Sequence, residues 1–203
     1  MIEIFVIMGL AYGLGSIPTG YLMGRGLKGI DIRTVGSGNV GATNVFRSVG
    51  KMAGVATLLV DIAKGFLAVE LALIFLGGNL WPLFAGVAVV GGHSWSFWVH
   101  FRGGKGVATS AGVFLALLPV PMGIALLVFA LLFGLSRRVS VGSIGAAMVL
   151  PVAAQGLESP ASRVLLALIL SGVVIFRHIP NIRRLLRGEE PPLFTLSKKG
   201  PLP

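Results

Sequence analysis

The chain has 203 residues, of which 55% are hydrophobic and only 12% are charged, and its mean hydropathy is +0.91. Such values exclude an ordinary soluble domain and predict an all-α integral membrane protein. The chain contains no cysteine, which excludes disulfides and thiolate metal sites. The net charge of +10 calls for anionic surroundings, with membrane lipid and nucleic acid as the two candidates.

Long apolar stretches, broken by short polar segments, predict seven transmembrane helices. In chain order the predicted ranges are 3–24, 52–76, 80–100, 106–119, 121–136, 140–157 and 161–178. The first lacks a basic leader region and a small-residue cleavage site, so we expect a retained helix. A turn at 77–79 separates the second helix from the third, and Pro119 and Pro121 separate the fourth from the fifth.

The basic residues predict the orientation of these helices. With a break at the two prolines, fifteen of the 17 Lys and Arg residues lie on one face, all but Lys64 and Arg163. The positive-inside rule makes that face cytoplasmic, with the amino terminus outside and the carboxyl terminus inside. Anchoring to anionic lipid then explains the charge, and we expect no nucleic-acid partner.

Three polar segments lie on this cytoplasmic face. They are GSGNVGATNVFR at 36–47, GGHSWSFWVHFRGGKGVAT at 91–109 and FRHIPNIRRLLRGEE at 176–190. The first fits the dinucleotide-binding pattern G-x-G-x-x-G, but that pattern has meaning only between a strand and a helix of a βαβ unit. The surrounding apolar helices leave no room for a parallel sheet, so we exclude a dinucleotide fold.

The first two segments have the chemistry of phosphate sites. Glycines let backbone amides approach an anion, and Arg47 adds a planar guanidinium suited to phosphate. In the second segment Lys105 stands at the start of a helix, whose dipole also favours an anion. His93 in the same segment is suited equally to anion binding and to capping a turn.

The third segment places Arg177, Asn181 and Arg184 on one helical face, with His178 beside Asn181. Two further ionisable residues, Asp61 and Lys64, fall inside a predicted membrane helix at i and i+3. Ionisable groups are costly in such a helix, so we expect them to pair with each other or to serve a site.

In their order along the chain, the three segments resemble the bacterial acyl-phosphate-dependent glycerol-3-phosphate acyltransferases. The stretches SIPTGYL at 16–22 and DIAKG at 61–65 agree as well, so the resemblance runs across nearly the whole chain. It implies transfer of an acyl group from acyl phosphate to the 1-hydroxyl of glycerol 3-phosphate. The products are lysophosphatidic acid and inorganic phosphate, and the step is the first acylation in bacterial phospholipid synthesis.

The resemblance also implies the site residues and the setting. The core residues are Ser37, Arg47, Lys105, His178 and Asn181. The substrate-binding residues are Gly36, Gly38, Asn39, Gly41, Thr43, Asn44, Gly92, His93, Gly103, Gly104, Gly106, Arg177 and Glu190, the last holding the carboxyl-terminal segment through an arginine. We expect no metal and no cofactor, one domain over 1–203, and a monomer in the bacterial inner membrane with its site facing the cytoplasm.

Two alternatives stay open on the sequence. The general base is either His178 or an oxygen of the substrate phosphate. The competing function is a membrane transporter of a phosphorylated solute, although transporters often contain inverted repeats with a site at the bilayer midplane, and the chain has no evident repeat.

Overall fold

The computed structural model describes residues 1–78 and 80–194, and within these ranges every regular element is a helix. Asn79, part of the predicted turn, and the tail at 195–203 lie outside the described residues. The α-helices are α1 (Ile2–Ser16), α2 (Thr19–Lys28), α3 (Ala42–Ser48), α4 (Lys51–Leu76), α5 (Trp81–Ser94), α6 (Val107–Leu117), α7 (Pro119–Ser136), α8 (Val139–Gly156), α9 (Ala161–Arg177) and α10 (Ile179–Leu186). Two 3₁₀ helices, η1 (Ile32–Thr34) and η2 (Phe97–Val99), lie in the connections.

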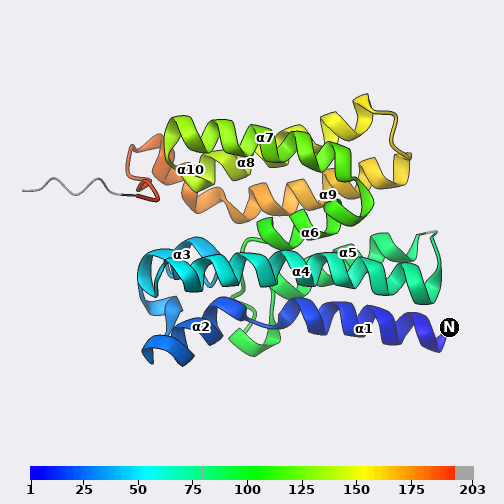
Figure 1. Ribbon diagram of the computed structural model, residues 1–203, viewed down its shortest axis with the longest axis horizontal. Helices are drawn as coiled ribbons and strands as arrows, with labels where there is room; N and C mark the ends of the chain where they lie inside the picture. Colours follow the sequence, from blue (N-terminus) through cyan, green and yellow to red (C-terminus); the bar gives the residue numbers. More distant parts are fainter. Residues whose placement is uncertain (79, 195–203) are drawn as a thin grey trace, which may run out of the picture.

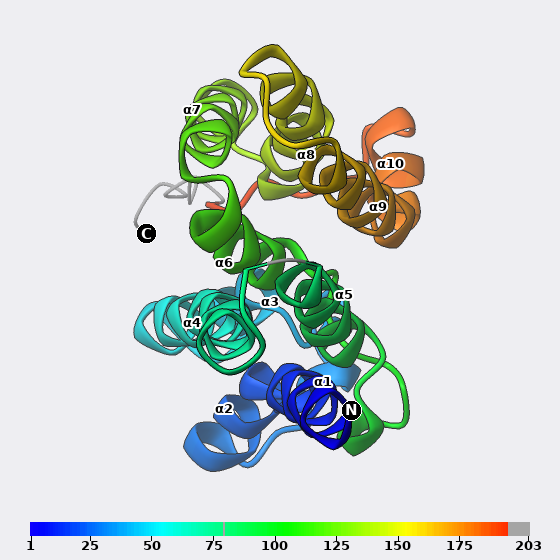
Figure 2. The same cartoon turned by 90° about the vertical axis from the view of Figure 1, so that its right-hand side faces the viewer.

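The long helices form two groups that share one central helix. Helix α1 packs on α5 and α4, while α8 packs on α7 and α9. Helix α6 lies between the two groups and packs chiefly against α4 (Figure 2). The short helices α2, α3 and α10 gather at the end of the bundle remote from the amino terminus (Figure 1). The polar segments of the sequence are therefore brought to one end.

Among the described residues, three helical segments are long and apolar enough to cross a membrane: Ile2–Lys28, Pro119–Ser136 and Val139–Gly156. A fourth is added when α9 and α10, which meet at a bend of 55°, are taken together. Large apolar side chains such as Leu127 and Leu135 of α7 stay exposed, as a lipid-facing surface requires. The chain is an all-α integral membrane protein.

The predicted first helix at 3–24 is wrong as a continuous element. Helix α1 ends at Ser16, and α2 begins only after Pro18. Proline has no backbone N–H and forces the residue before it out of helical geometry, and Ile17 accordingly adopts ψ 113°. The break exposes the Ile17 carbonyl, which accepts a hydrogen bond from Lys64 Nζ at 3.2 Å.

The predicted third helix at 80–100 is also wrong, because α5 ends at Ser94. Beyond it the chain passes through η2 and then two left-handed residues, His100 (φ 56°) and Phe101 (φ 60°). The Gly104 amide then donates to the His93 carbonyl at 3.0 Å. The second polar segment thus folds back onto the helix that leads into it, which hydropathy alone does not reveal.

The remaining predictions are close to the structure. The break at the two prolines is confirmed, since α6 ends at Leu117 and α7 begins at Pro119, where a proline fits the first turn of a helix. Helices α4, α8 and α9 lie within one residue of the predicted ends. Helices α3 and α10 were not predicted, because polar, glycine-flanked segments carry little apolar periodicity.

The pairing of Asp61 with Lys64 inside α4 is confirmed. Lys64 Nζ lies 2.8 Å from Asp61 Oδ1, and both side chains are 3% exposed. Thr19 also donates to Asp61 Oδ1 at 3.2 Å. A paired, hydrogen-bonded ion pair is the form in which such charges are tolerated away from water.

Helices α4 and α6 approach closely because each presents a glycine to the backbone of the other. A Cβ atom on Gly65 would collide with the Thr109 carbonyl oxygen, and one on Gly112 would collide with that of Ile62. Small residues at helix crossings allow this approach in membrane proteins. The contact places α6, and the residues at its amino-terminal end, against the first group of helices.

We predict that Gly112→Ala destabilises the protein by about 1–3 kcal/mol, because the new methyl group forces α4 and α6 apart. The matched control is Gly123→Ala in α7, where no heavy atom lies within 4 Å of the added Cβ. That change should be neutral or stabilise by up to about 1 kcal/mol through helix propensity. Thermal unfolding in detergent measures both, and equal shifts for the two variants would contradict the close contact.

Candidate functional site

A chain of hydrogen bonds joins the second polar segment to the third. Lys105 Nζ donates to Asn181 Oδ1 at 2.7 Å, and Asn181 Nδ2 donates to Glu190 Oε1 at 2.7 Å. Glu190 also accepts from Ser140 Oγ at 2.8 Å and from Arg184 Nε at 2.7 Å. The lysine is thereby held by an amide whose own orientation is set by a buried carboxylate.

The bend between α9 and α10 places His178 beside this chain. Its amide donates to the carbonyls of Val174 and Ile175, and Pro180 stands in the first turn of α10. The imidazole is buried, with Nδ1 2.8 Å from the Val174 carbonyl oxygen. A carbonyl only accepts, so Nδ1 carries a proton, and in the neutral ring Nε2 is left as an acceptor.

Arg177 clamps the glycine loop of the second segment. Its Nη2 donates to the Gly103 carbonyl at 2.8 Å and to the Gly104 carbonyl at 2.9 Å, while Nε donates to Gly104 at 3.1 Å. Gly106, with φ 81°, is the N-cap of α6. Lys105 therefore projects from a loop fixed on both sides, and the predicted substrate ligand Arg177 has its donors engaged with backbone.

Asn44 organises the first polar segment from inside. Its Nδ2 donates to the carbonyls of Ile32, Val35 and Asn39 at 2.9–3.0 Å, and its Oδ1 accepts from the Ser37 amide at 3.0 Å. The side chain is 2% exposed. These bonds use its polar atoms, so in this structure Asn44 shapes the loop and does not face a substrate.

The rest of the first segment is a turn that leads into α3. Gly36 (φ 58°) and Gly38 (φ 70°) adopt left-handed geometry that suits glycine. Gly41 is the N-cap of α3, and its amide donates to Asn39 Oδ1 at 2.9 Å. Ser37 is exposed and Thr43 is half-buried. The amides of Ser37, Gly38 and Gly41 donate within the segment and fix the shape of the loop.

Arg47 connects the first segment to the carboxyl-terminal segment. Its Nη2 donates to the carbonyls of Pro191 and Pro192 at 3.2 and 3.0 Å. The rings of Phe46 and Phe194 meet edge to face with centroids 5.7 Å apart. All three polar segments therefore meet around the stretch that begins at Glu190.

Charge in this region is unevenly balanced. Burial lowers the pKa of Lys105 to about 8, and the Glu190 carboxylate opposes that shift. Three nearby cations lower it further: Arg184, Arg177 and Arg47. Burial also tends to raise the pKa of Glu190, but the hydrogen bonds that it accepts outweigh burial and hold that pKa below its usual value. The carboxylate therefore stays ionised, and the lysine is poised to gain from an added anion.

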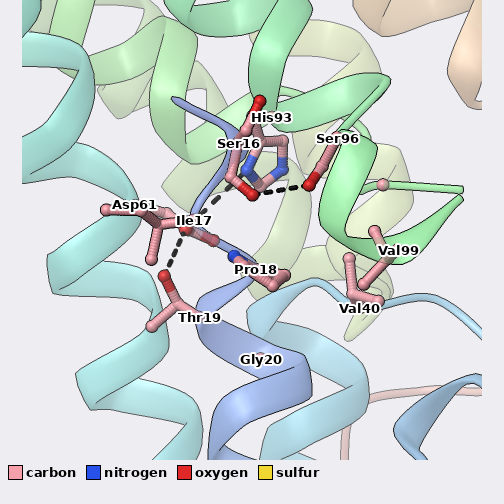
Figure 3. A pocket seen from close by; sticks show the side chains of 11 residues that line it. Ser16, Ile17, Pro18, Thr19, Gly20, Val40, Asp61, His93, Ser96 and Val99 are labelled. Carbon is pink, nitrogen blue, oxygen red and sulfur yellow. Dashed lines mark hydrogen bonds and ion pairs between the residues drawn. The ribbon is translucent and has the colours of Figure 1, made fainter. Parts of the chain in front are cut away.

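Gly92 and His93 lie apart from this cluster. Gly92 packs against α1, where a Cβ atom would collide with the Tyr12 carbonyl oxygen. His93 is buried, and its Nδ1 lies 3.7 Å from Asp61 Oδ1 (Figure 3). Most of the predicted site residues lie close together in the structure. Gly92 and His93 instead lie on the inner side of the glycine loop, toward α1 and α4.

Two contributors were not singled out as site residues from the sequence. Ser140, at the start of α8, donates to Glu190, and the backbone of 191–192 accepts from Arg47. A lone serine after a basic pair and two proline carbonyls carry no recognisable pattern. The sequence does place Arg184 on the same helical face as Asn181, and in the structure both side chains donate to Glu190.

Comparisons with known proteins agree over nearly the whole chain. The family model described as glycerol-3-phosphate acyltransferase matches residues 5–188. A glycerol-3-phosphate acyltransferase of Synechococcus sp. (strain CC9902) is 46% identical over 193 residues, covering 94% of this chain and 96% of the relative. Another, of Endomicrobium trichonymphae, is 43% identical over 199 residues, covering 98% and 100%.

Solved structures of PlsY (YgiH), described as an integral membrane glycerol 3-phosphate acyltransferase, have the same fold. The glycerol 3-phosphate form has a TM-score of 0.90 at 39% identity and covers 95% of this chain and 96% of its own. The lysophosphatidic acid form has a TM-score of 0.86 at 37% identity and covers 93% and 94%. By family model, sequence identity and fold, the chain belongs to the glycerol-3-phosphate acyltransferase family.

Proposed function

We propose that the protein transfers an acyl group from acyl phosphate to the 1-hydroxyl of glycerol 3-phosphate, releasing lysophosphatidic acid and inorganic phosphate. The observation that carries this proposal is the cluster of Arg47, Lys105, Arg177, Arg184 and Glu190. Four cations stand there with one carboxylate, and both proposed substrates carry phosphate. Relatives crystallised in glycerol 3-phosphate and lysophosphatidic acid forms support the same acceptor and product.

We assign the phosphate groups of the two substrates to Ser37, Arg47 and Lys105. With a pKa of about 8, Lys105 is mostly charged at neutral pH, and it loses little by exchanging its amide partner for a phosphate oxygen. Gly36 adds a backbone amide, which can bind an anion without a side-chain charge, while the amides of Gly38 and Gly41 donate to the Val35 carbonyl and to Asn39 Oδ1 and so fix the turn from which Ser37 projects. Charge-assisted contacts of this kind are worth about 1.5–3 kcal/mol each.

His178 and Asn181 orient the acceptor in this proposal. Nε2 of His178 accepts a hydrogen bond from the 2-hydroxyl of glycerol 3-phosphate and so positions the neighbouring 1-hydroxyl, whose oxygen attacks the acyl carbonyl carbon. The bond from that carbon to the phosphate oxygen breaks, and phosphate leaves. The hydroxyl proton passes to a phosphate oxygen of the substrate, because a mixed anhydride needs little help from a strong base and positioning supplies most of the acceleration.

We also propose a seven-helix topology with the amino terminus outside and the site facing the cytoplasm of a bacterial inner membrane. The short helices and the basic residues at one end of the bundle support this orientation (Figure 1). The helices that cross in this proposal are α1 continued by α2, α4, α5, α6, α7, α8 and α9. Because the cluster is assembled from one chain, we infer that the monomer is active.

We predict that purified protein releases phosphate only when acyl phosphate and glycerol 3-phosphate are both present, with one lysophosphatidic acid formed per phosphate. No nucleotide, metal or carrier-protein thioester should be needed. The competing transporter function predicts instead accumulation of glycerol 3-phosphate in proteoliposomes without acyl transfer. Accumulation with no phosphate release would overturn the proposal.

We predict an alkaline limb in the pH profile of kcat/KM near pH 8. The pKa of Lys105 is about 8, so its charge, and with it the phosphate contact, is lost as pH rises through that value. In Lys105→Arg the guanidinium stays charged, so the limb should disappear even if the maximal rate is lower. A limb that persists at the same pH in Lys105→Arg belongs to another group.

We predict that a cysteine at Val120, which is exposed beside the start of α7, reacts with an impermeant thiol reagent in intact cells, whereas one at Arg138 reacts only after permeabilisation. The native chain has no cysteine, so the background is clean. Helix α7 begins and ends beside these two positions. Labelling of both from the same side would contradict the topology.

A further inference from the structure

We propose that His93, which lies beside Asp61, is a positioning residue for Lys105 that acts by supporting Gly104 from inside the bundle. This inference deepens the proposed function, since it assumes that Lys105 holds a substrate phosphate. It removes His93 from the substrate ligands and gives the Asp61–Lys64 pair a role at the site. Four segments of the chain meet around the imidazole of His93.

On one side the imidazole faces a carboxylate that is itself held in place. Nδ1 of His93 lies 3.7 Å from Asp61 Oδ1 (Figure 3). The same oxygen accepts from Thr19 Oγ1 at 3.2 Å and from Lys64 Nζ at 2.8 Å. Lys64 also donates to the carbonyl of Ile17 at the proline break, which accepts from the Thr19 amide as well. The position of Asp61 therefore depends on both the α1–α2 break and α4.

The other side of His93 supports the glycine loop. The His93 carbonyl accepts from the Gly104 amide at 3.0 Å. A Cβ atom on Gly104 would collide with His93 Nε2, so the ring lies directly against the Gly104 backbone. On the opposite side, Arg177 binds the Gly104 carbonyl at 2.9 Å. Gly104 is thus enclosed between His93 and Arg177, and the next residue is Lys105.

The space beside His93 does not suit a substrate. The cavity lined by Asp61, His93, Ser96 and Gly103 has a volume of about 10 Å³, which is the space of a single water molecule. A phosphate group does not fit there. The ring is 8% exposed, so its contacts are with the protein, and its influence reaches the substrate through the loop.

A double-mutant cycle tests the contact between the ring and the loop. Gly104→Ala should lower kcat/KM roughly 10- to 100-fold in the otherwise native protein, because a shift of about 1 Å in the loop misplaces Lys105. In a His93→Ala background the ring is gone and the methyl group has room. The Gly104→Ala effect should then be smaller by about threefold or more, as expected for residues in contact. Purely additive effects would overturn the proposal.

The environment of Lys105 gives a second readout. With the support removed in His93→Ala or Asp61→Asn, the loop should loosen and Lys105 should become more hydrated. Its titration should then move from about 8 toward the value of about 10.4 for a free lysine. The charged groups acting on Lys105 are otherwise unchanged in these variants: Glu190, Arg184, Arg177 and Arg47.

The titration is followed by the pH dependence of Lys105 acetylation, quantified by mass spectrometry, and by the alkaline limb of kcat/KM. The matched control is Arg163→Met, which removes a 2.8 Å hydrogen bond to the Leu117 carbonyl in another part of the bundle. It should leave the titration in place even if it lowers the unfolding temperature. An unchanged titration in both test variants, or an equal shift in the control, would overturn the positioning role.

Failure of this inference differs from failure of the proposed function. Acetylation of Lys105 does not require turnover, so it reports the loop whether or not acyl phosphate is the donor. If native protein releases no phosphate, the proposed function is wrong while the acetylation result still stands. If native protein is active and the variants do not move the titration, only the positioning role is wrong.

Discussion

The carboxylate of Glu190 is buried, and a buried charge persists only where hydrogen bonds replace the water that it has lost. Asn181 and Arg184 of α10 and Ser140 of α8 supply those bonds. The same bonds fix Asn181, which in turn holds Lys105. Asn181, Ser140 and Arg184, and through Asn181 also Lys105, are therefore held in place by one buried carboxylate.

Away from that end, the helices pack closely and pair their charges within the bundle. Helices α4 and α6 approach through glycines, and the Asp61–Lys64 pair neutralises itself within one turn of α4. Neither arrangement leaves a polar group that needs water as a partner, and a hydrocarbon environment offers no water. At the break before Pro18 the Ile17 carbonyl is likewise satisfied within the protein, because it accepts hydrogen bonds from Lys64 Nζ and the Thr19 amide.

Hydropathy and charge were sufficient to predict the long helices, since their apolar length is a direct requirement of the bilayer. They were insufficient at Ser16 and Ser94, where a helix ends inside a stretch that contains no charged residue. At Ser94 the deciding event is the return of Gly104 to the His93 carbonyl, a contact between residues eleven positions apart that no periodicity encodes. The three polar segments were recognisable because glycine beside Arg or Lys is chemically distinctive, whereas Ser140 had no such neighbours.

The composition of the site follows from the chemistry of the proposed donor. An acyl phosphate already carries a good leaving group, so the protein has to hold two anionic substrates in line and has little need of a nucleophile or a metal. Backbone amides and fixed cations perform that task, and glycine is the residue that lets backbone reach a phosphate. This explains why the first segment fits a dinucleotide-binding pattern without a dinucleotide fold. A dinucleotide-binding loop and this segment both need a backbone that can come close to phosphate. In a membrane helix bundle, loops at one end provide such a backbone.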